Sequence, residues 1–162
     1  MDHVDFITQQ WAKERPDLDV TAMGIIGRVA RLYLAYQKEM HKTFARYGLN
    51  AAKFDVLATL RRAGAPHTLS PGALLEATMV ASGTMTNRID RLQADGLVQR
   101  TVNPEDSRSF LIALTDKGLT LIDEVVTEHV KTQASMITGL ETSEIEIFQT
   151  LLSKALVAAE LD

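Results

Sequence analysis

Residues 70–118 read SPGALLEATMVASGTMTNRIDRLQADGLVQRTVNPEDSRSFLIALTDKG, and the order of signals in this stretch decides the fold. Ser70-Pro71 places a capping hydroxyl before a proline at the first helical position, which predicts the start of a short helix. Ser82 can cap a second helix, which Gly96 ends. Two short helices joined by a tight turn, from about Ser70 to Asp95, have the spacing of a helix-turn-helix.

A β-hairpin is predicted directly after the second helix, from Leu97 to Leu114. The runs LVQRTV and FLIALT are prone to form strands, and the turn-forming stretch NPEDSRS separates them. This connection is longer than a two-residue turn, and it places Arg108 at the far end of the hairpin. A hairpin that follows a helix-turn-helix is the wing of a winged helix.

Upstream of this stretch, the sequence predicts two helices. Apolar side chains recur at steps of three and four from Met23 to Phe44, and Gly48 can close that long helix in the left-handed conformation. Asn50 is expected to cap a second helix, which stops at Gly64. Residues 67–69, His-Thr-Leu, could form a very short strand.

Downstream of the hairpin, two further amphipathic helices are expected. Thr115 caps the first, and the second begins near Thr142 or Ser143. Both are poor in basic residues, so we expect them to pack against the first long helix, in the same chain or in a second copy. The predicted fold is mainly α, a winged helix-turn-helix with a small β-hairpin wing plus terminal dimerisation helices. Its parts are residues 1–47 (ligand pocket and dimerisation), 48–115 (DNA binding) and 116–162 (dimerisation).

Composition excludes several functional classes. The chain has 162 residues, 46% of them hydrophobic, and no cysteine, so disulfides, thiolate metal sites and cysteine nucleophiles are excluded. The four histidines lack the spacing of metal ligands, and we expect no metal and no cofactor. No phosphate loop or nucleophile elbow points to an enzyme, and a small cofactor-free enzyme is the weakest alternative. The first residues do not resemble a signal peptide, and no apolar run could span a membrane, so a cytoplasmic location and no membrane partner are expected.

The charge is unevenly distributed along the chain. The net charge is −4, with eight basic and two acidic side chains in residues 21–64, but four basic and five acidic in residues 65–115. Affinity for DNA therefore cannot come from a uniformly basic domain. It has to rest on a few placed groups, above all Arg88 and Arg108, and on their duplication in a dimer.

The first turns of the second helix carry the polar side chains that a major groove accepts. Serine and threonine can bond phosphates or bases, asparagine can pair with adenine, and arginine can bind guanine through two hydrogen bonds. The same side chains also suit an ordinary capped and solvated helix, and only the winged order of elements favours DNA binding. The candidate DNA contacts on this helix are Ser82, Thr84, Thr86, Asn87 and Arg88.

In the wing, Arg108 is expected to enter the minor groove or to contact phosphate. Asp106, two residues earlier, could hold the arginine side chain or its backbone. The alternative is that Asp106 and Arg108 are a solvated pair in a turn, worth under about 1 kcal/mol.

Residues 82–118 resemble the central signature of the MarR family of transcriptional regulators, and the similarity extends over nearly the whole chain. Asn103 and Ser107 depart from the family pattern, in which Asp and Arg are frequent. The resemblance implies a homodimer joined by its terminal helices, which binds a near-palindromic operator on double-stranded DNA and releases it on binding a small ligand. Repression is implied because most members repress. The matching positions are Leu92, Gly96, Leu97, Arg100, Asp106, Arg108, Leu114, Thr115 and Gly118.

WAKERPDLD at residues 11–19 and FDVLATLRRAGAP at 54–66 resemble the urate-responsive branch of that family. This resemblance implies a pocket for urate or a similar purine or aromatic anion, formed by Trp11, Asp55 and Arg62 with a second arginine, for which Arg100 is the first choice and Arg88 the second. Asp55 and Arg62 are two helical turns apart and so share a face. If Asp55 pairs with the second arginine, an anionic ligand would disturb that pair and shift the DNA-binding helices.

Two alternatives to the ligand pocket remain open. Trp11 would then pack over the dimer core, and Asp55 with Arg62 would form a plain structural ion pair. The protein would in that case be a winged-helix DNA-binding protein of the same fold that senses no small molecule.

Overall fold

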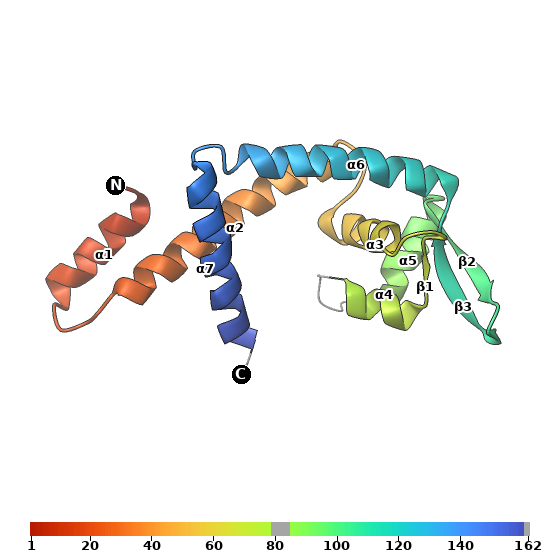
Figure 1. The fold of residues 1–162 in the computed structure, drawn as a ribbon, viewed down its shortest axis with the longest axis horizontal. Coiled ribbons are helices and arrows are strands. Elements are labelled where there is room, and N and C mark those ends of the chain that lie inside the picture. The colour runs from red at the N-terminus through yellow and green to blue at the C-terminus, as the bar shows by residue number, and fades with distance from the viewer. Residues whose placement is uncertain (79–84, 161–162) are drawn as a thin grey trace. The chain divides into compact units, whose positions relative to one another are not determined.

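The computed structural model describes residues 1–78 and 85–160, and the chain divides into two compact units, residues 1–42 and 43–162. The first unit contains α1 (His3–Glu14) and most of α2 (Thr21–Ala45) (Figure 1). Asp2 caps α1 by accepting hydrogen bonds from the backbone N–H groups of Val4 and Asp5. Arg28 of α2 forms ion pairs with Asp2, at 2.9 Å, and with Asp5, which tie the two helices together.

The second unit holds the predicted winged helix. In chain order its elements are α3 (Ala51–Arg62), β1 (Thr68–Leu69), α4 (Pro71–Ala77), α5 (Met85–Ala94), β2 (Val98–Asn103), β3 (Asp106–Leu114), α6 (Asp116–Ser135) and α7 (Thr142–Glu160). The described strands form one antiparallel sheet in the order β1-β3-β2, and β2 with β3 projects as a hairpin (Figure 1). The predicted mainly helical fold with a small sheet is confirmed.

Helix α3 is the centre of this unit. Its Val56, Leu57 and Leu60 are fully buried, and α4, α5, α6 and β3 all pack against it. Leu92 of α5 and Ile122 of α6 are also fully buried in this core. Each such side chain contributes roughly 1.5–3 kcal/mol through burial, so the core fixes α5 and the wing relative to α3.

The helix caps predicted at Asn50, Ser70 and Thr115 are confirmed, whereas the cap predicted at Ser82 lies outside the described residues. The side chains of Asn50, Ser70 and Thr115 accept hydrogen bonds from the backbone N–H groups three residues later, at 2.9, 3.2 and 3.0 Å. Gly48 and Gly96 adopt positive φ angles of 68° and 71° at the helix ends where closure was expected. These signals are local, and so they are readable without the fold.

The predicted wing loop is wrong in length. β2 ends at Asn103 and β3 already begins at Asp106, so only Pro104 and Glu105 connect the strands. The strand register shifts between Val102 and Asn103, which marks an irregularity near the turn. Strand pairing therefore extends into the stretch expected to be loop, and Arg108 lies within β3, close to the turn, rather than at a loop tip.

Candidate nucleic-acid interface and ligand site

Helix α5 presents a polar face to solvent. Ile89 and Leu92 are buried and anchor the helix, whereas Thr86 and Asn87 are exposed. Arg88 is half-buried. Ser82 and Thr84, the first two candidate contacts, lie outside the described residues. Since α5 is the second helix of the helix-turn-helix, we call it the reading helix below.

The wing carries a second set of polar groups. The Asp106 carboxylate accepts a hydrogen bond from the backbone N–H of Arg108 at 3.0 Å, and the Asp106 carbonyl oxygen accepts one from the Ser109 hydroxyl. Both Asp106 and Arg108 are exposed. No ion pair with a described residue engages the Arg108 guanidinium. Asp106 thus orders the Arg108 backbone and leaves the side chain able to reach an external phosphate.

Arg100 joins the wing to the reading helix. From β2 its guanidinium forms an ion pair with Asp90 at 2.5 Å and donates a hydrogen bond to Gln93, both on α5. It also lies over the Phe110 ring of β3, 5.4 Å from the centroid. The position of the wing relative to α5 therefore depends directly on this side chain.

Asp55 lies in the second turn of α3, and Arg62 is the last residue of that helix. Asp55 is 7% exposed, and Arg62 is exposed. The Arg62 guanidinium donates a hydrogen bond to the carbonyl oxygen of Ala77, the last residue of α4. Arg62 is thus attached to the end of the first helix of the helix-turn-helix, immediately before the segment that leads to α5.

Trp11 lies on α1 in the first unit, with 41% of its surface exposed. The other three candidate ligand residues, Asp55, Arg62 and Arg100, belong to the second unit. Within the second unit, the positions of the candidate ligand residues can therefore be compared for these three alone.

Several contacts were not predicted from the sequence. Asp90 and Gln93 are the partners of Arg100, and their spacing of three on one helix was the only local signal for them. Two lysines, Lys53 and Lys117, meet at Asp95. No local sequence pattern predicts these contacts, because α3, α5 and α6 come together only in the folded unit.

The described residues contain neither a metal-ligand cluster nor a membrane-spanning helix. Among residues 1–78 and 85–160, no group of three His, Cys, Asp or Glu side chains could hold a metal ion. Over the same residues, no helix has the length and apolar character needed to cross a membrane.

Comparison with known proteins identifies the family. The MarR family profile matches residues 47–109. The transcriptional regulator PecS of Dickeya dadantii is 42% identical over 151 residues, which cover 93% of this chain and 91% of PecS.

Solved structures agree. BpsR of Bordetella bronchiseptica, studied for the regulation of its DNA binding by 6-hydroxynicotinic acid, is 29% identical with a TM-score of 0.69, covering 80% of this chain and 90% of BpsR. A MarR-like regulator of Bacillus cereus is 25% identical with a TM-score of 0.75, covering 86% of this chain and 99% of that one. These relatives are transcriptional regulators and not enzymes, and the chain belongs to the MarR family of winged-helix, DNA-binding transcriptional regulators.

Proposed function

We propose that this regulator is a homodimeric repressor that binds a near-palindromic operator and releases it on binding urate or a similar heteroaromatic anion. One observation supports the proposed effect of the ligand on DNA binding. Arg62 and Arg100, two of the side chains expected to bind the ligand, already bond to the two helices of the helix-turn-helix, Arg62 to the last residue of α4 and Arg100 to α5. A ligand that engages them competes with contacts that position α4, α5 and the wing.

For DNA binding, the proposal assigns different roles to the two polar sets. Thr86, Asn87 and Arg88, with Ser82 and Thr84 before them, contact bases and nearby phosphates in the major groove. Arg108 contacts the backbone or minor groove beside it, and Asp106 orders its main chain. The exposure of Thr86, Asn87 and Arg108 supports these roles.

For the ligand, an anionic ring suits the side chains available. Arginine binds a carboxylate or a urate edge through two parallel hydrogen bonds. The regulation of BpsR by 6-hydroxynicotinic acid supports the class of ligand, a small heteroaromatic acid. Urate and 6-hydroxynicotinate are therefore both candidate effectors.

The dimer is supported by helices that leave large apolar side chains uncovered. No described residue of α7 is buried, although this helix carries several large apolar side chains. Exposed apolar patches of this extent on a monomer mark association surfaces. On α7 they are Ile147, Phe148, Leu151, Leu152, Leu156 and Val157, and on α2 they include Ile25, Ile26, Leu32 and Leu34.

The proposal is tested by DNA binding with and without effector. Fluorescence anisotropy would measure affinity for the DNA that flanks the coding region of this protein, in the presence of urate, xanthine or 6-hydroxynicotinate. We expect saturable weakening of DNA binding by at least one of the three. If DNA binds tightly and none of the three weakens binding at millimolar concentration, the regulator without small-molecule sensing replaces this proposal.

A matched pair of variants tests the ligand site. Arg62→Gln removes the expected anion contact, whereas Arg61→Gln removes its neighbour on α3, which pairs with Asp123 at 2.6 Å. We expect R62Q to raise the effector concentration needed for release by about tenfold, and R61Q to leave it unchanged. Equal responses of the two variants would remove Arg62 from the site.

A further inference from the structure

A pocket that none of the proposed DNA or ligand residues lines opens on the second unit, at the C-terminal end of the reading helix. Its volume is about 540 Å³. We call it the lysine pocket. It is lined by Tyr47, Gly48, Leu49, Lys53, Asp95, Leu97, Lys117 and Leu121.

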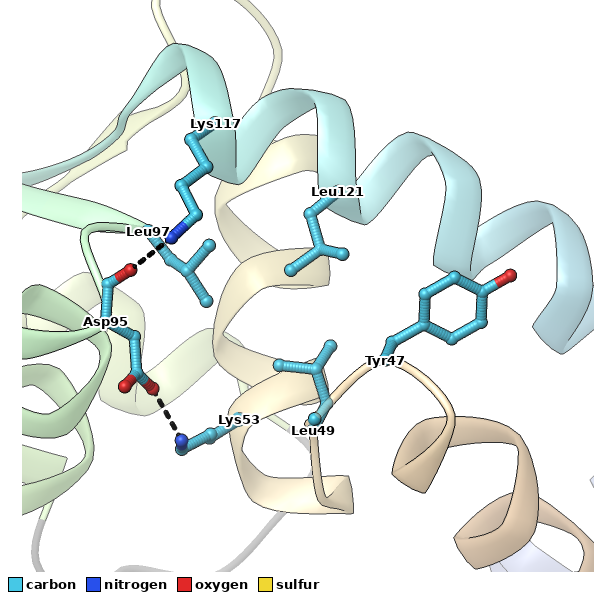
Figure 2. A pocket seen from close by; sticks show the side chains of 8 residues that line it. Tyr47, Leu49, Lys53, Asp95, Leu97, Lys117 and Leu121 are labelled. Carbon is cyan, nitrogen blue, oxygen red and sulfur yellow. Dashed lines mark hydrogen bonds and ion pairs between the residues drawn. The ribbon is translucent and has the colours of Figure 1, made fainter.

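One side of the lysine pocket is cationic. Lys53 of α3 forms an ion pair with the Asp95 carboxylate at 2.6 Å, and Lys117 of α6 donates a hydrogen bond to the Asp95 carbonyl oxygen at 2.8 Å. Figure 2 shows both ammonium groups directed at Asp95. Two ammonium groups face one carboxylate, so this side retains an excess of positive charge.

The charge is reinforced by the helices that carry it. Lys53 and Lys117 each lie in the first turn of a helix, where the helix dipole adds a partial positive charge. Lys53 keeps only 21% of its side chain exposed. Partial burial of this kind strengthens the attraction of an ammonium group for an anion.

The rest of the lysine pocket is apolar. Leu49 and Leu97 are buried and Leu121 is half-buried, and the three lie between the lysines and the Tyr47 ring (Figure 2). Burial, with the carboxylates of Glu124 and Glu128 nearby, raises the pKa of Tyr47, so its hydroxyl stays protonated and neutral. The lysine pocket thus has a cationic side and an apolar side, and it is complementary to an acid with an anionic end and an apolar body.

We propose that the lysine pocket binds a small organic acid with an apolar ring. The carboxylate of this ligand replaces Asp95 as the partner of the Lys53 and Lys117 ammonium groups. The apolar body then covers Leu49, Leu97 and Leu121. This site is separate from the one proposed above for Arg62 and Arg100.

The location of Asp95 links occupancy to DNA binding. Asp95 follows the last residue of α5, and Gly96 with Leu97 closes that helix through the Leu97 N–H bond to the Leu92 carbonyl oxygen, 2.9 Å. Asp95 therefore joins the reading helix to both α3 and α6. A ligand that displaces Asp95 loosens the end of α5 and weakens operator binding. This effect on DNA rests on the proposed function, whereas binding of the ligand to the lysine pocket does not.

Calorimetry with 1-naphthoate on the full chain without DNA tests binding. We expect a saturable site for which acetate, with the charge alone, and 1-naphthamide, with the ring alone, are each at least about tenfold weaker. In ¹H–¹⁵N spectra, the amides of Leu49, Asp95 and Gly96 should shift with the same affinity. No saturable binding at millimolar naphthoate, or shifts confined to other residues, overturns the proposal.

Variants separate a ligand site from a purely structural ion pair. Lys53→Met and Lys117→Met should each weaken naphthoate binding about tenfold, and Lys131→Met, which removes an exposed lysine of α6 that pairs with Glu128, should not. Asp95→Asn removes the competing carboxylate and should tighten binding severalfold, a gain that loss of folding cannot mimic. Unchanged affinity in K53M and K117M, or weaker binding in D95N, overturns the assignment.

The DNA arm is separate. Naphthoate should lower operator affinity in the wild type and in R62Q alike, but much less in K53M. If the protein binds no DNA under any condition, the proposed function is contradicted, but the calorimetric measurement of naphthoate binding is unaffected. Naphthoate binding without any change in operator affinity overturns the link through Asp95 alone.

Discussion

Arg108 carries its charge beside the two-residue turn of the wing, with its backbone held by Asp106. A phosphate contact there adds affinity that does not depend on sequence. We expect Arg108→Ala to weaken binding roughly equally on specific and nonspecific DNA, and to lower the slope of log K against log salt by about one. Anisotropy titrations over a range of salt concentrations measure both quantities.

Arg46→Ala is the matched control for this prediction. Arg46 is an exposed arginine outside the wing, 3.9 Å from Glu128. Its removal should leave the salt slope unchanged. An Arg108→Ala protein with the wild-type slope would show that the wing does not contact phosphate.

Gly118 shows how closely α6 approaches the start of the wing. A Cβ atom added at this position would lie 2.0 Å from the Leu97 carbonyl oxygen, which is backbone and cannot rotate away. We expect Gly118→Ala to lower the free energy of unfolding by about 3 kcal/mol. Gly139→Ala, where no atom lies within 4 Å of the added Cβ, should change it little. Chemical denaturation of the two variants gives the comparison, and similar stabilities would contradict the close approach.

His129 packs beside two aromatic rings, Phe44 and Phe54, which stack on each other with centroids 4.4 Å apart. The Phe44 and Phe54 centroids lie 5.5 and 4.7 Å from its own, and its Nδ1 is shielded from solvent without a hydrogen bond to a described residue. Burial lowers the pKa of His129 below its ordinary value of 6.5. Between the lowered pKa and 6.5 the unfolded chain binds the extra proton, so stability is complete above pH 6.5 and decreases as the pH falls.

The pH dependence is tested by replacing the ring. From about pH 7 to about pH 5, the wild type should lose more unfolding free energy than His129→Phe. His41→Gln, at an exposed histidine, should retain the wild-type loss. A His129→Phe protein that loses as much stability as the wild type would assign the acid sensitivity to other groups.

At the scale of elements, Thr115 connects the end of the reading helix to α6 because its hydroxyl both accepts and donates a hydrogen bond. The oxygen accepts a bond from the Gly118 N–H at 3.0 Å, and the hydroxyl donates one to the Gly96 carbonyl oxygen at 2.8 Å. Thr115→Val should cost about 1–2 kcal/mol, and Thr115→Ser should restore most of it. Thermal or urea unfolding measures this. A Ser variant as unstable as the Val variant would implicate the methyl group instead.

The sequence predicted the elements better than their ends. Helix caps at Asn50, Ser70 and Thr115 were predicted correctly because a cap is a contact between residues three apart. The wing turn was predicted too long, since Asn103 to Ser109 carry turn-forming side chains. Pairing of β3 with β2 extends to Asn103 and Asp106 and imposes strand conformation on residues whose own preference is weak.

At the scale of the whole molecule, the exposed apolar side chains of α7 predict association. A charge at the centre of such a surface opposes burial, since an unpaired buried carboxylate costs several kcal/mol. We expect Leu151→Glu to convert a dimer into monomers in light scattering, and to abolish preference for palindromic over single half-site DNA. Two reading helices would otherwise span roughly 34 Å, one turn of duplex.

Gln149→Glu places the same charge at a polar position of the same helix and should leave the dimer intact. A wild-type protein that is monomeric at micromolar concentration would remove the basis for palindrome recognition.

The sequence by itself determined the winged helix, its caps and its polar reading helix, because these follow from periodicity and from contacts a few residues apart. Only the tertiary structure decided that Arg100 holds Asp90 and Gln93, that Arg62 holds Ala77, and that Lys53 and Lys117 converge on Asp95. The partners are 7 to 42 residues apart in the chain and lie on different elements, and any arginine or lysine has many carboxylates and carbonyl groups within its possible reach. Burial of α3 among α4, α5, α6 and β3 selects one set of partners, and that packing is a property of the whole unit.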